Sequence, residues 1–472
     1  MSRTLSDLPG PRPWPLVGNP IAAHRAHLQF EEWARRYGRL FRFRLGPISI
    51  VGVTDPEIAR TAMQQRPERY TRIQRTNQIM YDLHVGGVFA AEGDAWRRQR
   101  RLLNPSFHGR HLDTFADPIR VVTERLRQYW LGTTERSSER GEDVLADLMR
   151  YTVDVTSVVS FGQDLNTVSG GGDELQRQLA YVFQVVERRS NSPFDYWKLP
   201  GVGLRTRRRM RRLDAFLRDL IVQARERQAR EPDRRERPST LLESMLLATD
   251  DEARLPLSDQ EVAANVLTVL LAGEDTTANT LAFALYHLAK HPDVLARARQ
   301  EVDAALGDAF VPTLDQAREL TYLDAIAQET LRMTPPTPLV PLQATEDVTI
   351  DDLQVPAGTV LLLLTRMMAT SPDVFDDPLT FRPERWLEGD AEQRRHHRRM
   401  MLAFGGGPRV CPGRSLALLE CAMVLAMVLR TFDFSLVDPD APLREVTQFT
   451  IRPEGVRLRF KKRGASQKNI GR

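Results

Sequence analysis

One segment, residues 259–290, constrains the fold more than any other part of the chain. Ser258 and Glu261 fit a capping box at its start, and His291-Pro292 ends it. The pattern predicts a single helix of roughly 32 residues and about 48 Å. Residues 266–272 are apolar almost all round, which is typical of a helix buried through the centre of a molecule.

The middle of this predicted helix breaks its own pattern. Gly273-Glu274-Asp275-Thr276-Thr277 places a glycine, two acids and two hydroxyls where the surroundings are apolar. Buried polar groups cost stability unless they are paired, and a glycine inside a helix costs about 1 kcal/mol. Such violations cluster at functional sites. The alternative is a helix with one wet face, which Asn279 and Thr280 continue.

Composition limits the class of protein. At 42% hydrophobic and 27% charged residues, the 472-residue chain is that of a globular protein with a sizeable core. Its 66 basic and 62 acidic residues leave a net charge of +4, which does not favour a general nucleic-acid binder.

The two cysteines and the apolar runs indicate a compartment. Cys411 and Cys421 are about 15 Å apart if one helix carries both, which is too far for a disulfide. A reducing environment follows. The longest apolar runs are roughly nine residues, half of a membrane span, and no apolar signal segment opens the chain. We expect a soluble cytoplasmic protein.

The remaining pattern predicts a mainly α fold with small β-sheets (α+β), in one domain that spans 1–472. A proline-rich extended lead occupies about 1–20. A small β-rich lobe comes from about 38–55, where a hairpin is expected, and from 345–385. The rest forms a helical lobe. The arginine-rich runs 205–212 and 225–237 are expected to be solvated helix faces and a loop.

The stretch Phe404-Gly-Gly-Gly-Pro-Arg-Val-Cys-Pro-Gly413 carries the strongest chemical signal. Its glycines let the backbone approach a flat group closely. Cys411 stands just before an apolar helix at about 414–429, whose amides favour a thiolate, and Arg409 adds a positive charge. Phe404 can shield the sulfur from water. With no second cysteine nearby, a zinc or iron–sulfur site lacks ligands, whereas an axial haem ligand needs only one thiolate.

This stretch resembles the haem-binding signature of the cytochrome P-450 superfamily, the haem-thiolate monooxygenases. Phe404, Gly407, Arg409, Cys411 and Gly413 occupy its fixed positions. The resemblance covers essentially the whole chain and implies a haem b between a long distal helix and the proximal cysteine loop and helix, with Cys411 as the metal ligand. Cys421 is expected to be a core residue.

Other family landmarks follow in order. Trp96-x-x-x-Arg100 resembles the pair that binds a haem propionate, and Arg409 is implied as a third partner. Glu329-x-x-Arg332 and Arg385 resemble the family's buried ionic support near the haem loop. Gln343 stands where many members carry a further propionate-binding Arg or His, so one propionate would be held by neutral or water-mediated bonds.

By the same resemblance, Ala272-Gly273-x-Asp275-Thr276-Thr277 is the oxygen-activation motif. It implies that Thr276 bonds dioxygen and its waters, that Asp275 relays protons from solvent, and that Ala272 lies against the cofactor. Cys411 would push electron density into the iron. Glu274 is expected to face away, and Thr277 has a lesser part.

The family pattern also implies partners and a pocket. Electrons derived from NAD(P)H would come through a ferredoxin or flavodoxin-type protein and its reductase. The run 394–399 is either its docking patch or a mobile solvated loop. A monomer is expected. The pocket would draw on the stretches 73–89, 183–197, 337–340 and 449–451, and on Leu271, Ala272, Thr337, Leu339 and Val340, for a hydrophobic or amphipathic small molecule.

Three functions follow in order of preference. The first is insertion of one atom of dioxygen, as hydroxylation or epoxidation. The second keeps the haem but catalyses coupling, dehydration, desaturation, isomerisation or a peroxide-driven reaction, and the intact Asp275–Thr276 pair argues against peroxide use. The third is a non-enzymatic arginine-rich interaction protein, which only the basic clusters support.

Overall fold

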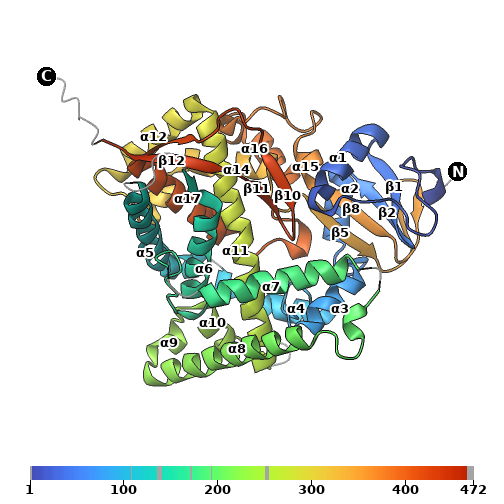
Figure 1. Ribbon diagram of the computed structural model, residues 1–472, viewed down its shortest axis with the longest axis horizontal. Coiled ribbons are helices and arrows are strands. Elements are labelled where there is room, and N and C mark those ends of the chain that lie inside the picture. The colour runs from blue at the N-terminus through green and yellow to red at the C-terminus, as the bar shows by residue number, and fades with distance from the viewer. Residues whose placement is uncertain are drawn as a thin grey trace.

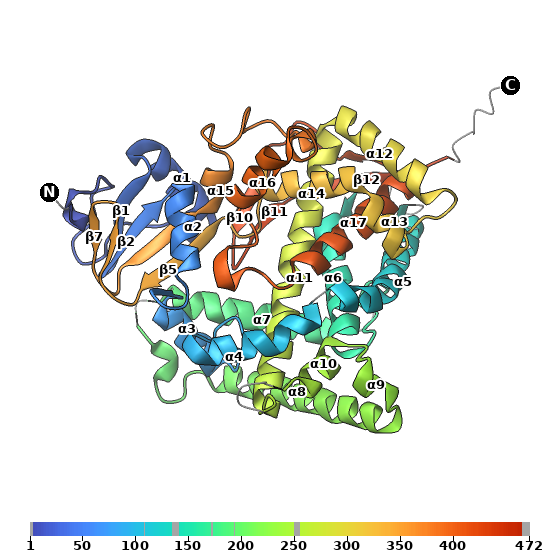
Figure 2. The same ribbon diagram turned by 180° about the vertical axis from the view of Figure 1, so that it is seen from behind.

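The computed structural model describes residues 3–107, 109–134, 141–170, 173–192, 194–249 and 255–464. A large helical part lies beside a smaller part built on a five-stranded sheet, with the N-terminus at the sheet end (Figure 1). The view from behind shows the long helix Asp259–Lys290 running through the helical part (Figure 2). The predicted α+β class, mainly helical with small sheets, is confirmed.

Helices dominate the described residues. In chain order they are α1 (Ala26–Tyr37), α2 (Pro56–Gln64), α3 (Gln74–Asp82), α4 (Gly93–Leu103), α5 (Gly109–Thr134), α6 (Val144–Phe161), α7 (Asp173–Ser190), α8 (Leu204–Arg230), α9 (Asp233–Glu236), α10 (Leu241–Leu247), α11 (Asp259–Lys290), α12 (Pro292–Leu306), α13 (Leu314–Glu319), α14 (Thr321–Met333), α15 (Thr365–Ala369), α16 (Ala391–Met400) and α17 (Arg414–Thr431).

The strands are short. They are β1 (Leu40–Leu45), β2 (Ile48–Val53), β3 (Tyr70–Thr71), β4 (Glu142–Asp143), β5 (Leu339–Ala344), β6 (Val348–Ile350), β7 (Leu353–Val355), β8 (Val360–Leu364), β9 (Phe432–Leu436), β10 (Arg444–Thr447), β11 (Ile451–Glu454) and β12 (Arg457–Lys462). The largest sheet has the order β1-β2-β8-β5-β3, and within it β2 and β8 run parallel, with Val51 opposite Leu361.

The long helix α11 has the bounds that its end signals predict. The Ser258 hydroxyl accepts a bond from the Glu261 amide at 3.3 Å, and the Glu261 carboxylate accepts one from the Ser258 amide at 2.8 Å. Around it packs the main hydrophobic core, formed largely by helical residues. Gly273 lets α11 approach α6 closely, since a Cβ there would lie 2.8 Å from Thr156 Oγ1. The two helices therefore pack at close range beside the polar middle of α11.

Two local predictions differ from the structure. The lead is not simply extended: residues Leu5–Asp7 form a 3-10 turn, and Arg3 pairs with Leu353. The run 394–399 is helical and not a loop, since it belongs to α16. Asp390 caps the start of this helix by accepting a bond from the Gln393 amide at 2.7 Å. The hairpin expected near residue 46 is confirmed as β1–β2, which closes at the pair Leu45 and Ile48.

No helix in the described ranges combines the length and apolarity that crossing a membrane requires.

Candidate functional site

The loop before α17 is shaped by its glycines. Gly405 and Gly407 have φ angles of 74° and 63°, in the left-handed region. At Gly407 a Cβ would lie 2.4 Å from the backbone oxygen of Met63, so the loop packs against the end of α2 with no room for a side chain. The Cys411 amide donates to the Phe404 carbonyl at 2.9 Å and closes the loop. Cys411 is thereby fixed next to the start of α17.

The Cys411 sulfur sits in a mixed electrostatic environment. Desolvation raises the pKa of its thiol, while the amides of Gly413 and Arg414 and the charge of Arg100 lower it. The residue is nevertheless accessible, in contrast to Cys421, which is buried in the core. In the part of the chain that the structure describes, no three His, Cys, Asp or Glu side chains gather in a way that could hold a metal ion. Cys411 is thus a single accessible sulfur with amides directed at it.

On α11, Ala272 and Thr276 are joined by a hydrogen bond. Ala272 is exposed although its neighbour Leu271 is buried. The Thr276 hydroxyl donates to the Ala272 carbonyl at 2.8 Å, so its proton is engaged within the helix. The lone pairs of that hydroxyl remain available as acceptors.

Burial changes the pKa of the Asp275 carboxyl group. Desolvation raises its pKa to about 6, against the effects of the Arg452 charge and the Thr450 hydroxyl. Thr450 lies on the turn between β10 and β11 and accepts a bond from the Asn279 amide at 3.1 Å. The sequence placed Thr450 in a pocket stretch but gave no sign of this contact with the acid.

Glu274 points to a different surface of α11. It is 1% exposed, its backbone carbonyl accepts a bond from Thr152 on α6 at 2.9 Å, and neither carboxyl oxygen has a hydrogen-bond partner among the described residues. Desolvation, and then the charge of Asp275, raise the pKa of its carboxyl group to about 8, while the nearby Gln176 side chain acts to lower that pKa. Burial therefore shifts this carboxyl group toward its protonated form.

Three arginines and one glutamate form a cationic cluster beside Trp96. The Arg409 guanidinium lies 4.5 Å from the Trp96 ring centroid and forms an ion pair with Glu92. Arg66 is 3.8 Å from Glu92, and Arg72 donates to the Phe89 carbonyl at 2.7 Å. Burial first, and then the mutual repulsion of the arginines, lowers the pKa of Arg72 to about 9.

This cluster has unused donors. Nε and Nη1 of Arg409, and Nε and Nη2 of Arg66, are buried without hydrogen-bond partners within the described ranges. Buried cationic donors without partners are costly, and carboxylates satisfy them well. The residues present therefore fit a group that carries carboxylates beside a thiolate-bound metal. Sequence reasoning missed Arg66, Arg72 and Glu92, because nothing in their local pattern separates them from the many other charged residues of the chain.

Arg100 and Gln343, which the sequence analysis placed near the cofactor, also bond to backbone groups of the protein. Arg100 donates to the Val410 carbonyl at 2.8 Å, so it braces the cysteine loop. Gln343, on β5, accepts a bond from the Gln74 amide at 2.9 Å and donates to the Gly358 carbonyl at 3.1 Å. Both polar ends of Gln343 are thus engaged by backbone groups.

The predicted structural support forms a closed ionic cluster. Glu329, fully buried, accepts bonds from Arg332 at 2.8 Å and from Arg385 at 2.9 Å. Trp386 Nε1 and the Arg382 amide also donate to it, at 3.0 and 2.9 Å. These bonds keep the pKa of Glu329 low despite its burial. The cluster joins α14 to the segment that leads to α16 and the cysteine loop.

An apolar cavity lies against the Ala272 region of α11. Leu271 and Ala272 line it, whereas Thr337, Leu339 and Val340 do not. The rest of its wall comes from several separate parts of the chain. The lining residues there are Met80, Val85, Phe89, Val182, Phe183, Val186, Thr268 and Phe449.

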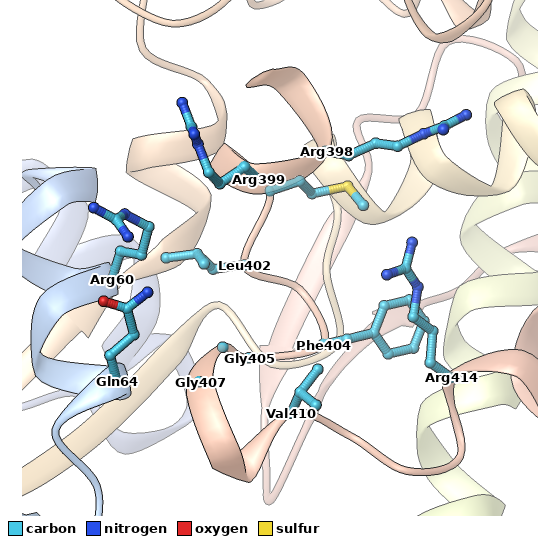
Figure 3. Close-up of a pocket in the computed structure, with 12 residues that line it drawn as sticks. Arg60, Gln64, Arg398, Arg399, Leu402, Phe404, Gly405, Gly407, Val410 and Arg414 are labelled. Carbon is cyan, nitrogen blue, oxygen red and sulfur yellow. The ribbon is translucent and has the colours of Figure 1, made fainter. Parts of the chain in front are cut away.

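A hollow of about 230 Å³ lies beside the cysteine loop (Figure 3). Its wall combines the loop residues around Phe404 with four arginines: Arg60, Arg398, Arg399 and Arg414. Arg60 pairs with Glu57 at 2.6 Å, whereas no described carboxylate lies within ion-pair distance of Arg398, Arg399 or Arg414. Arg394 is turned away, donating to the Gly389 carbonyl at 2.6 Å. The face above the loop is therefore basic.

Comparison with known proteins agrees with this geometry. The sequence model of the cytochrome P450 family matches residues 8–460. Flavonoid 3'-monooxygenase of Petunia hybrida is 28% identical over 461 residues, which cover 92% of this chain and 87% of the relative. Human cytochrome P450 3A5 is 28% identical over 459 residues, covering 95% and 89%. The crystal structure of the cytochrome P450DA heme domain superposes with a TM-score of 0.83 at 27% identity, covering 98% of this chain and 99% of that one. Because the family model spans almost the whole chain and the solved heme domain shares its fold, this chain belongs to the cytochrome P450 family.

Proposed function

We propose that this protein is a haem-thiolate monooxygenase that inserts one atom of dioxygen into a hydrophobic small molecule, by hydroxylation or epoxidation. The observation that carries the proposal is the single accessible Cys411 sulfur, which faces the Gly413 and Arg414 amides and lies near Arg100. Family membership supports the same chemistry, an oxygen-incorporating oxidoreductase with a haem-thiolate iron.

The cofactor-binding residues divide into two groups. Cys411, held by the loop that Gly407 allows, would bind the haem iron through its sulfur, and Phe404 of the same loop would shield that sulfur from water. Trp96, Arg66, Arg72 and Arg409 are the proposed partners of the carboxylate side chains of haem. When bound, haem supplies an iron that binds dioxygen and accepts electrons one at a time.

The proposed catalytic residues handle protons on α11. Thr276 keeps its own proton on the Ala272 carbonyl and offers its lone pairs to a proton carrier. Asp275, with a pKa of about 6, can take a proton from solvent and release it near neutral pH. Thr450 orients this carboxyl group and favours its charged form.

The decisive measurement is the absorption spectrum of the reduced protein with carbon monoxide. A Soret band at the position diagnostic of thiolate ligation is expected, and Cys411→Ala should abolish it, whereas Cys421→Ala, a change in the core, should keep it. A haem-free protein, or a spectrum of histidine-ligated haem, would refute the proposal and return attention to the basic surface clusters.

The dioxygen-dependent reaction is separated from its alternatives by its requirements. A monooxygenase needs dioxygen, reductant and an electron-transfer protein together. Product formation from hydrogen peroxide alone, at the same rate and without reductant, would favour the peroxide-driven reaction instead.

We further propose that the basic hollow around Arg398, Arg399 and Arg414 docks an acidic ferredoxin or flavodoxin-type protein. Charge reversal of Arg398 and Arg399 to Glu should slow reduction by such a partner at least about tenfold at low salt and remove its salt dependence. The matched control is Arg394→Glu, because Arg394 lies on the same helix but bonds to the Gly389 carbonyl and does not line the hollow. An unchanged rate in the double variant would exclude this docking surface.

A further inference from the structure

Polar side chains follow the lining residues of the apolar cavity along two of the helices that form its wall. On α7, Val182 and Val186 line the cavity, and Arg189 follows Val186 by three residues on the same face. On α3, Asn77 precedes the lining residue Met80 by three. The apolar stripe of each helix therefore passes into a polar residue about one turn, 5.4 Å, further along.

We define the Arg189 cluster as Arg75, Asn77, Arg189, Ser190 and Trp197. The Arg189 guanidinium lies 5.0 Å and that of Arg75 5.8 Å from the Trp197 ring centroid, so the three side chains meet. Arg189 is 6% exposed and Trp197 7% exposed. The cluster thus joins α3 to the end of α7 and to the turn Tyr196–Lys198.

Four polar atoms of this cluster are buried without a hydrogen-bond partner within the described ranges. They are Arg75 Nε, Asn77 Oδ1, Ser190 Oγ and Trp197 Nε1. Three of them can donate, and rotation of the Asn77 amide would present a fourth donor. Leaving such buried groups unpaired is costly. Three donors of this cluster therefore have no acceptor among the described residues.

Positive charges outnumber negative charges around the cluster. Asp195 is shared between Arg75, at 3.2 Å, and Lys198, at 2.7 Å. No described carboxylate lies within ion-pair distance of Arg189; Asp82 acts on it only from a distance, and Arg207 adds further positive charge. Burial accordingly lowers the pKa of Arg189. In the part of the chain that the structure describes, three arginines and a lysine are thus balanced by only two aspartates, one of them distant.

We propose that the Arg189 cluster binds the carboxylate of an amphipathic substrate whose apolar body occupies the cavity against α11. A carboxylate supplies the acceptors that Arg189, Trp197 and Ser190 lack, in charge-assisted bonds that a neutral group cannot match. Binding at this end fixes how far the apolar body reaches toward Ala272. The inference rests on the proposed function and narrows its substrate class to apolar carboxylic acids.

The test compares matched ligands on the haem-loaded protein. Decanoate, decanol and decyltrimethylammonium share an apolar chain and differ in the charge of the head group. We expect calorimetric titration to give at least about tenfold tighter binding of decanoate than of decanol, with the cation weakest. The spin-state change of the haem provides a second readout of the same binding.

The variants separate a charge effect from a change in shape. Arg189→Met keeps the length of the side chain without its charge, and should weaken decanoate about tenfold while leaving decanol unchanged. Arg188→Met, one residue away and exposed, should alter neither. Equal binding of decanoate and decanol to the unaltered protein, or an equal loss of both in Arg189→Met, would overturn the inference.

The spectrum with carbon monoxide is recorded first for every variant. If the unaltered protein lacks the thiolate-type Soret band, the proposed function fails. The carboxylate site can still be judged in that case, because calorimetry detects ligand binding without the spectrum. A normal spectrum with no preference for decanoate would count against the carboxylate site alone.

Discussion

The side-chain amide of Asn279 on α11 donates a hydrogen bond of 3.1 Å to the hydroxyl of Thr450, on the turn between β10 and β11. Because this hydroxyl accepts from Asn279, its own proton is directed elsewhere, and Thr450 lowers the pKa of Asp275. The same turn carries Phe449, which lines the apolar cavity. One hairpin thus contacts both the cavity and the acid.

Replacing Thr450 by Val should shift the pH dependence of turnover. Loss of the hydroxyl removes a bond to the charged form of Asp275, so its pKa rises above about 6 and the midpoint of the pH–rate profile moves to higher pH. Product formed per dioxygen consumed, measured across pH, reports the change. Thr450→Ser keeps the hydroxyl and should retain the original midpoint; identical profiles for the two variants would contradict the relay.

Glu329→Gln should destabilise the fold strongly. The neutral amide leaves Arg332 and Arg385, both buried, without a counter-charge, which costs roughly 3–5 kcal/mol. Urea unfolding measures the difference. Glu226→Gln, which breaks a surface pair with Arg230 at 3.2 Å, should stay within about 1 kcal/mol. A loss of similar size in both variants would show that burial does not set the strength of the Glu329 cluster.

Gly273 can be tested through its neighbour on α6. A glycine-to-alanine change inside a helix normally stabilises by about 1 kcal/mol. Here the added Cβ would lie 2.8 Å from Thr156 Oγ1, so Gly273→Ala should destabilise the otherwise unaltered protein. In a Thr156→Ala background the contact is gone, and Gly273→Ala should stabilise. A double-mutant cycle of unfolding free energies gives the coupling, and a value near zero would exclude the steric reading.

His287 should make the fold acid-sensitive. Burial, then the charge of His291, lowers the pKa of His287 to about 3. Its unfolded value is about 6.5, so the unfolded chain binds the proton first. The stability that this group contributes is complete above about pH 6.5 and declines by ~1.4 kcal/mol per pH unit as pH falls toward 3.

The control for this effect keeps the ring packing. His287 stacks on Phe381 with centroids 4.5 Å apart, and His287→Phe preserves an aromatic ring there without a titrating group. Urea unfolding at neutral and mildly acid pH should show a smaller loss for this variant. His24→Phe, at an exposed position, should leave the acid sensitivity unchanged, and equal losses in all three proteins would contradict the assignment.

Local chemistry explains which features could be predicted. The bounds of α11 follow from a capping box and a proline, and the Cys411 loop follows from residue types that have few other uses together. Arg66, Arg72 and Glu92 could not be found in this way, because only tertiary packing brings them to Arg409. The same holds for Arg60 and Arg414, which join Arg398 across the basic hollow, and for Thr450 opposite Asn279.

The parallel pairing of β2 with β8 has a consequence for how the chain is made. Val51 and its partner Leu361 are about three hundred residues apart, so β8 emerges from the ribosome roughly 15–60 s after β2 at ordinary rates of synthesis. Through that interval the β1–β2 hairpin has one edge without its neighbour, and exposed edges of this kind invite pairing with other chains. The main helical core also waits for late segments, because α17, whose residues belong to it, follows β8 along the chain.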